Sequence, residues 1–71
     1  MNRINTKKLL NSKWTAVNML NKEKHFIITE VEFDFKGNIV FCMIEAIISR
    51  RSEKLDWEEL KNQANWLQGW Q

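Results

Sequence analysis

Two segments of alternating side chains, on either side of Lys36-Gly37-Asn38, constrain the fold more than any other feature of this sequence. In residues 25–35 the odd positions are mostly apolar, whereas in residues 39–49 the apolar side chains occupy the even positions. Because successive side chains of a strand point to opposite faces, each segment is predicted to be a strand with one apolar face. Gly and Asn tolerate the positive φ of a tight turn, so the two strands are predicted to form an antiparallel hairpin.

The parity of the two segments predicts the register of this hairpin. With a loop of even length, Phe33 lies opposite Val40 and Val31 lies opposite Cys42, so the two apolar faces coincide. A loop of odd length would set an acidic face against an apolar one. We therefore predict an even loop, with these interior positions: Ile27, Thr29, Val31, Phe33, Phe35, Val40, Cys42, Ile44, Ala46 and Ile48.

The opposite face of the predicted hairpin is half apolar. Carboxylates at Glu30, Glu32, Asp34 and Glu45 share it with six apolar side chains. A second layer or a partner must cover part of such a face. The apolar members are Phe26, Ile28, Ile39, Phe41, Met43 and Ile47.

The flanking regions predict shorter elements. Residues 1–12 have no clear periodicity and are interpreted as an arm. Residues 13–17 are rich in Trp, Thr and Val and suit a strand, residues 18–24 read as a loop, and residues 52–55 suit another short strand.

A short C-terminal helix is predicted after Asp56. Asp56 and Glu59 have the spacing of a capping box. The positions Trp57, Leu60, Ala64 and Leu67 then form one helical stripe. Two more tryptophans, Trp66 and Trp70, lie off this stripe, so the helix is predicted to end near Asn65. With this early end we expect both indoles to fold back; the alternative is that they face outward.

The chain of 71 residues has room for a single domain, residues 1–71, with a thin core. We predict a mainly β fold: a small, curved antiparallel sheet of about three to five strands, in one version an SH3-like barrel, with the short C-terminal helix. The alternative is an α+β fold in which the helix covers a flat sheet.

The reactive residue types are too few and too scattered for recognisable catalytic or metal chemistry. Cys42 is the single cysteine and His25 the single histidine, whereas a structural zinc site needs four ligands. Cys42 falls on the apolar face of a strand, where burial makes a thiol unreactive. Carboxylates on a solvated strand face lack the pocket that acid–base catalysis needs. We therefore predict no enzyme, no cofactor and no metal.

Targeting signals are also missing from the sequence as given. The longest apolar run, residues 39–44, is too short to span a bilayer, and the first residues have no apolar stretch of signal-peptide length. We therefore expect a cytoplasmic protein with no membrane partner.

Charge is unevenly distributed along the chain. Residues 1–24 carry a net +5, residues 25–49 a net −3, and residues 50–71 are neutral, for a total of +2. A field of this size is modest for nucleic-acid binding, which usually neutralises several phosphates.

Surplus apolar surface favours a protein-binding module. Tryptophan serves cores and interfaces equally well, and in so small a chain Trp14 and Trp57 are expected in the core. The partner is predicted to be another protein or a second copy of this chain. The predicted contact residues are Trp66, Trp70, Phe41, Met43 and Phe26.

The alternative is binding of RNA or another single-stranded nucleic acid. Exposed indoles would then stack on bases, and basic side chains would contact phosphates. The predicted phosphate contacts are Lys7, Lys8, Lys13, Lys24, Arg50 and Arg51. A third hypothesis is that all four tryptophans are structural.

Four segments of the chain resemble a family of small Trp-rich bacterial proteins. They are residues 9–17 (LLNSKWTAV), 23–26 (EKHF), 55–61 (LDWEELK) and 65–70 (NWLQGW), and all four tryptophans match. Just before the third-segment tryptophan, where the family often has proline, this chain has Asp56. The resemblance implies a stand-alone cytoplasmic domain and brings with it no catalytic residue, cofactor or established partner.

Overall fold

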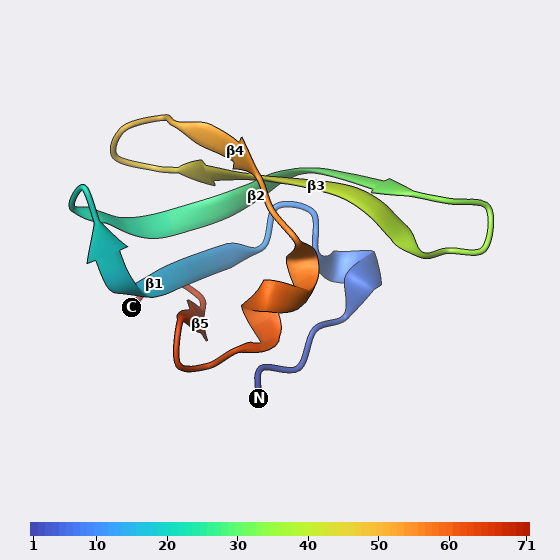
Figure 1. The fold of residues 1–71 in the computed structure, drawn as a ribbon, viewed down its shortest axis with the longest axis horizontal. Coiled ribbons are helices and arrows are strands. Elements are labelled where there is room, and N and C mark those ends of the chain that lie inside the picture. Colours follow the sequence, from blue (N-terminus) through green and yellow to red (C-terminus); the bar gives the residue numbers. More distant parts are fainter.

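Five antiparallel strands form one open sheet, and two short 3₁₀ helices come before the first strand and before the last (Figure 1). The computed structural model describes the backbone of residues 1–71 and every side chain except that of Leu20. In chain order the elements are η1 (Thr6–Lys8), β1 (Lys13–Leu20), β2 (Glu23–Phe33), β3 (Ile39–Ala46), β4 (Ser52–Lys54), η2 (Trp57–Lys61) and β5 (Trp66–Gln68).

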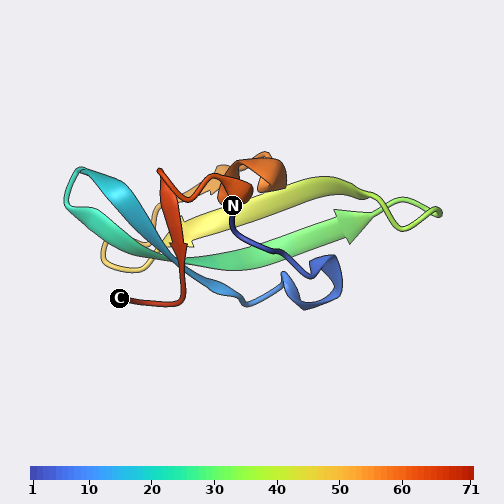
Figure 2. The ribbon, with the colours of Figure 1, turned by 90° about the horizontal axis from the view of Figure 1, so that it is seen from below.

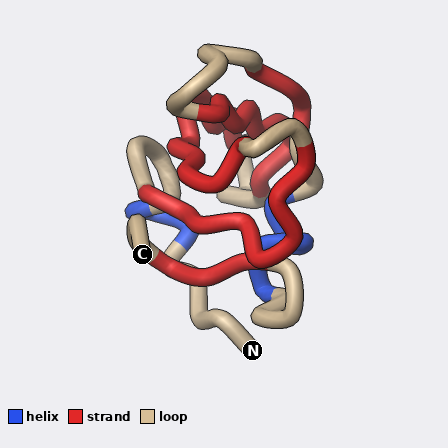
Figure 3. Tube along the Cα trace, turned by 90° about the vertical axis from the view of Figure 1, so that its left-hand side faces the viewer, coloured by secondary structure: helices blue, strands red, loops and turns tan.

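The sheet has the order β4-β3-β2-β1-β5, so β4 and β5 are its two edges. The prediction of a mainly β fold with a small antiparallel sheet is confirmed. The sheet is open, however, and the SH3-like barrel is not seen. Seen end-on, the strands twist across one another (Figure 3). The helices that the structure describes are too short to cross a membrane.

The turn between β1 and β2 takes only two residues. Leu20 pairs with Glu23, and Asn21 and Lys22 both have positive φ, at 56° and 62°. Two consecutive residues of this kind form a type I′ turn, whose twist matches that of the flanking strands. The predicted loop over residues 18–24 is therefore wrong, because β1 and β2 continue through most of it.

The β2–β3 hairpin has the predicted pairing of Val31 with Cys42 and an unpredicted loop. The backbone amide of Asp34 donates to the carbonyl of Asn38, which leaves a three-residue loop in which Gly37 has a φ of 86°. The prediction of an even loop is wrong. Val40 has no partner in β2 and is therefore an extra residue of β3. Because of it, Val31 and Cys42 pair as predicted although the loop is odd.

A second irregularity in β2, at Thr29, exchanges the two faces of that strand. Ile28 lies opposite Ile44, but Glu30 lies opposite Met43, so Thr29 is an extra residue. An extra residue reverses the alternation, and Phe26 and Ile28 therefore point to the core. The predictions that Ile27 and Thr29 are interior and that Phe26 and Ile28 are on the opposite face are wrong.

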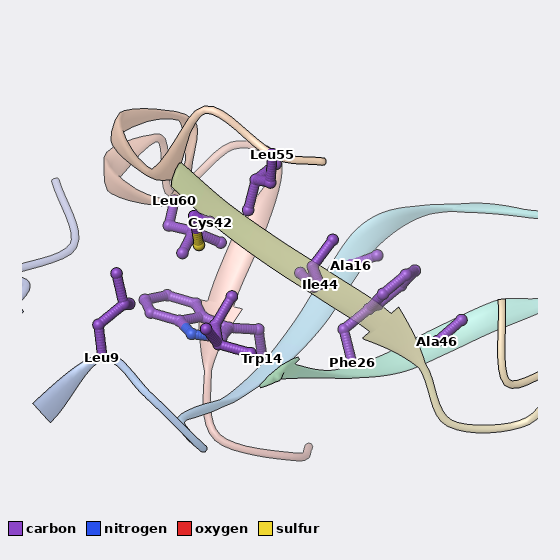
Figure 4. Packing of buried hydrophobic residues seen from close by; sticks show 10 residues of the cluster. Leu9, Trp14, Ala16, Phe26, Cys42, Ile44, Ala46, Leu55 and Leu60 are labelled. Carbon is purple, nitrogen blue, oxygen red and sulfur yellow. The ribbon is translucent and has the colours of Figure 1, made fainter. Parts of the chain in front are cut away.

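The core lies between the sheet and the two helices (Figures 2 and 4). Ile28, Ala46 and Leu60 are completely buried, and Trp14 lies among them beside Leu9. The buried apolar residues are Leu9, Trp14, Ala16, Phe26, Ile28, Cys42, Ile44, Ala46, Leu55 and Leu60.

The predicted C-terminal helix is a single 3₁₀ segment. Asp56 caps it by accepting a hydrogen bond from the amide of Glu58, and Leu60 is buried as expected. The helix ends at Asn62, whose backbone is extended, and Ala64 is exposed. The prediction of a stripe that continues through Ala64 and Leu67 is wrong, because Leu67 belongs to β5 and pairs with Thr15 of β1.

The first residues of the chain cross η2 and β5. The side-chain amide of Asn2 donates to the carbonyls of Leu60 and Trp66, at 2.8 and 2.7 Å. Ile4 packs against the core, and Leu9 is almost completely buried. The segment predicted as an arm is thus attached at Asn2, Ile4 and Leu9.

Candidate binding surfaces

Three of the four tryptophans contribute to the core. Trp14 is buried, and its Nε1 donates to the hydroxyl of Ser12. Trp57 and Trp66 are half-buried and pack against the core from η2 and β5. The expectation of a structural role is confirmed for Trp14 and Trp57, and Trp66 takes the same role.

Trp70 lies on the opposite side of the sheet from the core. Its Nε1 donates to the carbonyl of Phe26, and its ring stacks on His25 with centroids 5.8 Å apart. The ammonium of Lys13 lies 4.8 Å from the centroid of the indole. Thr15 accepts a hydrogen bond from the amide of Gln71, which holds the end of the chain against β1. Trp70 is 43 % exposed, so it is the indole most available to a partner.

The five residues predicted to contact a protein partner are not on one surface. Phe26 is buried and meets the edge of the Trp66 ring at 5.2 Å between centroids, so both belong to the core. Phe41 and Met43 are half-buried on the other face, opposite Glu32 and Glu30.

A groove lies where β3 extends beyond β4. It has a volume of about 430 Å³, and its walls come from β3 and from the chain that leads into η2. Trp57 and Val40 both line it, and Val40 is 57 % exposed. We call this cavity the Trp57 groove; its lining residues are Ile39, Val40, Phe41, Cys42, Lys54, Leu55, Asp56, Trp57 and Glu58.

The end of the β2–β3 hairpin, residues 32–41, projects beyond the other strands (Figure 1). Phe35 at its tip is 95 % exposed, and Phe33 is 45 % exposed. Asp34 closes the loop by accepting hydrogen bonds from the amides of Asn38 and Lys36, and these bonds lower the pKa of its carboxyl. The hairpin end is therefore an ordered loop with exposed aromatic rings.

The basic residues predicted to contact phosphates separate into two groups. Lys7 and Lys8 belong to η1, and Lys13 begins β1. Lys24 is the second residue of β2, and Arg50 and Arg51 precede β4, in the region of the β1–β2 turn. Arg51 is also neutralised, because it forms ion pairs with Glu23 and Glu53 at 2.6 and 2.7 Å.

Glu23 is a buried carboxylate with a complete set of partners. Its side chain is only 4 % exposed and accepts two hydrogen bonds from the Arg51 guanidinium and one from Ser49. The bonds from Arg51 and then Ser49 hold the pKa of Glu23 below its ordinary value, and the same contact raises the pKa of Arg51. This cluster joins the start of β2 to the β3–β4 connection.

Cys42 and His25 have structural surroundings. Cys42 is buried, and burial raises the pKa of its thiol, so the prediction of an interior cysteine is confirmed. His25 is half-buried, with its Nε2 3.0 Å from the carbonyl oxygen of Gln71. No group of three metal-ligating side chains occurs among the described residues.

Two features of these surfaces do not follow from the sequence. Trp57 packs against the core as expected, but it also lines a groove, and that groove depends on the point where β4 ends. Arg3 was not among the predicted basic contacts, although it lines a pocket with Lys8 and Lys13. The absence of any acidic residue before Glu23 was the available signal for the second feature.

A comparison with protein-family models identifies the class of protein to which this arrangement belongs. The model described as "Tryptophan-rich protein (DUF2389)" matches residues 12–71, which include every strand of the sheet. The chain therefore belongs to this family of Trp-rich proteins. No curated protein and no solved structure matches the chain.

Proposed function

We propose that this protein is a non-enzymatic protein-binding module that holds its partner in the Trp57 groove and against the hairpin end. The supporting observation is that the apolar face of the β2–β3 hairpin continues past the core. Phe33 continues the alternation of Val31, which packs against the core, and is 45 % exposed; Val40, next to its partner Ile39, is 57 % exposed. Contiguous exposed apolar surface of this kind marks interaction sites.

The shape of the surface suits an inserted side chain. The groove offers a concave site of mixed apolar and charged lining, to which both Trp57 and a free stretch of β3 contribute. Aromatic side chains in such pockets are the usual anchors of protein interfaces. Phe35 adds a ring that extends outward from the hairpin end and can enter a pocket on the partner.

The charge of this surface favours a basic partner. The hairpin end and the groove together contain Glu32, Asp34, Asp56 and Glu58 against two lysines. Each lysine lies near an aromatic ring: Lys36 is 5.7 Å from the Phe35 centroid and Lys54 is 5.9 Å from that of Phe41. The expected partner therefore presents an apolar or aromatic anchor flanked by lysine or arginine, since charge complementarity selects partners.

The test compares two double variants in affinity capture from the native cell after nuclease treatment. Phe35→Ala with Val40→Ala removes exposed apolar side chains from the proposed site, and Met19→Ala with Ile48→Ala removes exposed ones elsewhere. Proteins retained by the wild type and by the second variant, but lost from the first, are then purified and titrated directly. We expect at least one to bind with an affinity that falls about tenfold or more for the first variant. The proposal fails if both variants retain the same proteins.

Light scattering on the purified chain tests the second-copy version of this proposal. A dimer that the Phe35→Ala/Val40→Ala variant dissociates would identify a second copy of this chain as the partner. A monomer at high concentration, together with an unchanged set of captured proteins, would overturn both versions.

A further inference from the structure

We propose that a pocket between η1, β1 and β5 binds a phosphate group of a single-stranded nucleic acid. The pocket has a volume of about 170 Å³, equal to the liquid volume of roughly five or six water molecules. Its charged lining residues are Arg3, Lys8 and Lys13, its polar ones are Asn5, Ser12 and Gln68, and its apolar ones are Ile4, Leu9 and Trp14. This site is separate from the Trp57 groove, and the two proposals are independent.

The three cations of this pocket lack acidic neighbours. Among the side chains that the structure describes, none of the three has a carboxylate within ion-pair distance. Residues 1–22 contain no Asp or Glu, and neither does β5. Like charges gathered around one cavity repel each other, and an anion in the cavity removes that repulsion.

The fold holds the lining of the pocket in place. Asn5 caps η1 by accepting a hydrogen bond from the amide of Lys7, and the side chain of Gln68 donates to the carbonyl of Arg3. Ser12 donates to the carbonyl of Leu9 and accepts from the Trp14 indole, whose ring is buried. The backbone that carries the three cations is thus fixed to β1 and β5 before any ligand arrives.

An aromatic ring beside the pocket favours a nucleic acid over a simple anion. Lys13 lines the pocket, and its ammonium also lies 4.8 Å from the centroid of the partly exposed Trp70. Proteins that bind single strands combine cationic contacts to the backbone with aromatic side chains that contact the bases. A strand with one phosphate in the pocket can therefore pass Lys13 and reach the Trp70 indole, which lies on the other side of the sheet.

The test measures the fluorescence anisotropy of a labelled ten-nucleotide uridine RNA at several salt concentrations. If the three cations neutralise the phosphate in the pocket and its two neighbours along the strand, the slope of log affinity against log salt is about −2. Lys8→Gln is expected to weaken binding about fivefold and to reduce the slope by about 0.7. Lys7→Gln is the matched control, because Lys7 lies in the same helical turn but does not line the pocket.

Further measurements distinguish a nucleic acid from other ligands that carry a phosphate group. Uridine monophosphate and inorganic phosphate should compete with the RNA only weakly, since neither has a second phosphate or extends along the strand. RNA should quench tryptophan emission, and Trp70→Phe should reduce the quenching. Phe35→Ala with Val40→Ala should leave RNA affinity unchanged.

Four results would overturn the proposal. They are an absence of RNA binding, equal weakening by Lys8→Gln, Lys7→Gln and Lys24→Gln, competition by inorganic phosphate as strong as by unlabelled RNA, and binding only to vesicles of anionic lipid. Thermal unfolding of each variant serves as the control that the variant is folded at the temperature of the binding measurement.

Discussion

The two ends of the β2–β3 hairpin have similar side chains and different surroundings. Where β1 and β4 flank the hairpin, Ile28, Ile44 and Ala46 are at most 1 % exposed. At residues 32–41 neither neighbouring strand continues, and Phe33 and Val40 are about half exposed. Side-chain type is thus similar along the hairpin, but the neighbouring chain determines how far its apolar side chains are covered.

This difference separates stability from recognition within one element. The covered end supplies core contacts, whereas the projecting end contributes exposed apolar area that a partner can bury. Variants at the covered end should therefore lower the stability of the fold, whereas variants at the projecting end should weaken the binding of a partner.

Truncation at the covered end should have the largest effect. Ile28→Ala removes a completely buried side chain and is expected to lower the free energy of unfolding by about 2–5 kcal/mol. Phe33→Ala, in the same strand, should cost less than about 1 kcal/mol. Urea unfolding measures both. Because Ile28→Ala approaches the whole stability of so small a domain, Ile28→Val, at about 0.5–1.5 kcal/mol, is the second variant. Equal losses at Ile28 and Phe33 would show that the projecting end is part of the core.

Acid should destabilise the covered end through Glu23. Its pKa is lower in the folded protein than in the unfolded chain, so the ionised carboxylate stabilises the fold. That stabilisation is complete above the unfolded glutamate pKa of about 4.3 and is lost as the pH falls through the folded pKa. Thermal melts from pH 6 to pH 2 should show a smaller decline for Glu23→Gln than for the wild type.

Asp34 provides the comparison at the projecting end. Its pKa is also lowered, by hydrogen bonds from Asn38 and Lys36. Because these bonds close only a local loop, Asp34→Asn should alter the pH dependence of global unfolding less than Glu23→Gln does. A larger effect at Asp34 would mean that the hairpin end unfolds together with the core.

The sequence was sufficient to predict the sheet class and the two strands of the central hairpin, since alternation is a local property of each segment, but it did not predict β5 or the end of β1. It did not reveal the irregularities at Thr29 and Val40, because neither residue type marks a bulge and each bulge depends on its partner strand. The extra residue at Thr29 moved Phe26 from the predicted binding face into the core. The burial of Trp66 could not be predicted from the sequence either, because it depends on contact with Phe26, forty residues away.

The candidate surfaces were only partly predictable for the same reason. Exposed apolar area was expected from the half-apolar hairpin, and Phe41 does line the Trp57 groove. The groove itself requires β4 to end at Lys54, which no local pattern indicates. The charge gradient along the chain was visible, but the position of Arg3 beside Lys13 follows from the path of the first residues across β5.

A moderate effect is expected at the loop of the projecting end. Gly37 has a φ of 86°, and a Cβ added there would meet no atom within 4 Å, so Gly37→Ala costs only backbone strain. The expected loss is about 1 kcal/mol. Hydrogen exchange should show faster exchange in residues 32–41 and little change near Ile28. Uniform acceleration along β2 would contradict the separation of the two ends.

The smallest effect is expected at the opposite turn, where the chain uses no glycine. Lys22 has a φ of 62°, which a side chain with a Cβ adopts at a cost of about 1 kcal/mol, whereas Asn21 tolerates the same conformation more easily. Lys22→Gly should therefore raise the free energy of unfolding by a few tenths of a kcal/mol, since relief of strain exceeds the added freedom of the unfolded chain. Asn21→Gly should give less. Because this turn adjoins the covered end, the added stability should appear in the global unfolding by urea. If only the hydrogen exchange of the turn residues became slower, the β1–β2 turn, like the loop at Gly37, would open independently of the core.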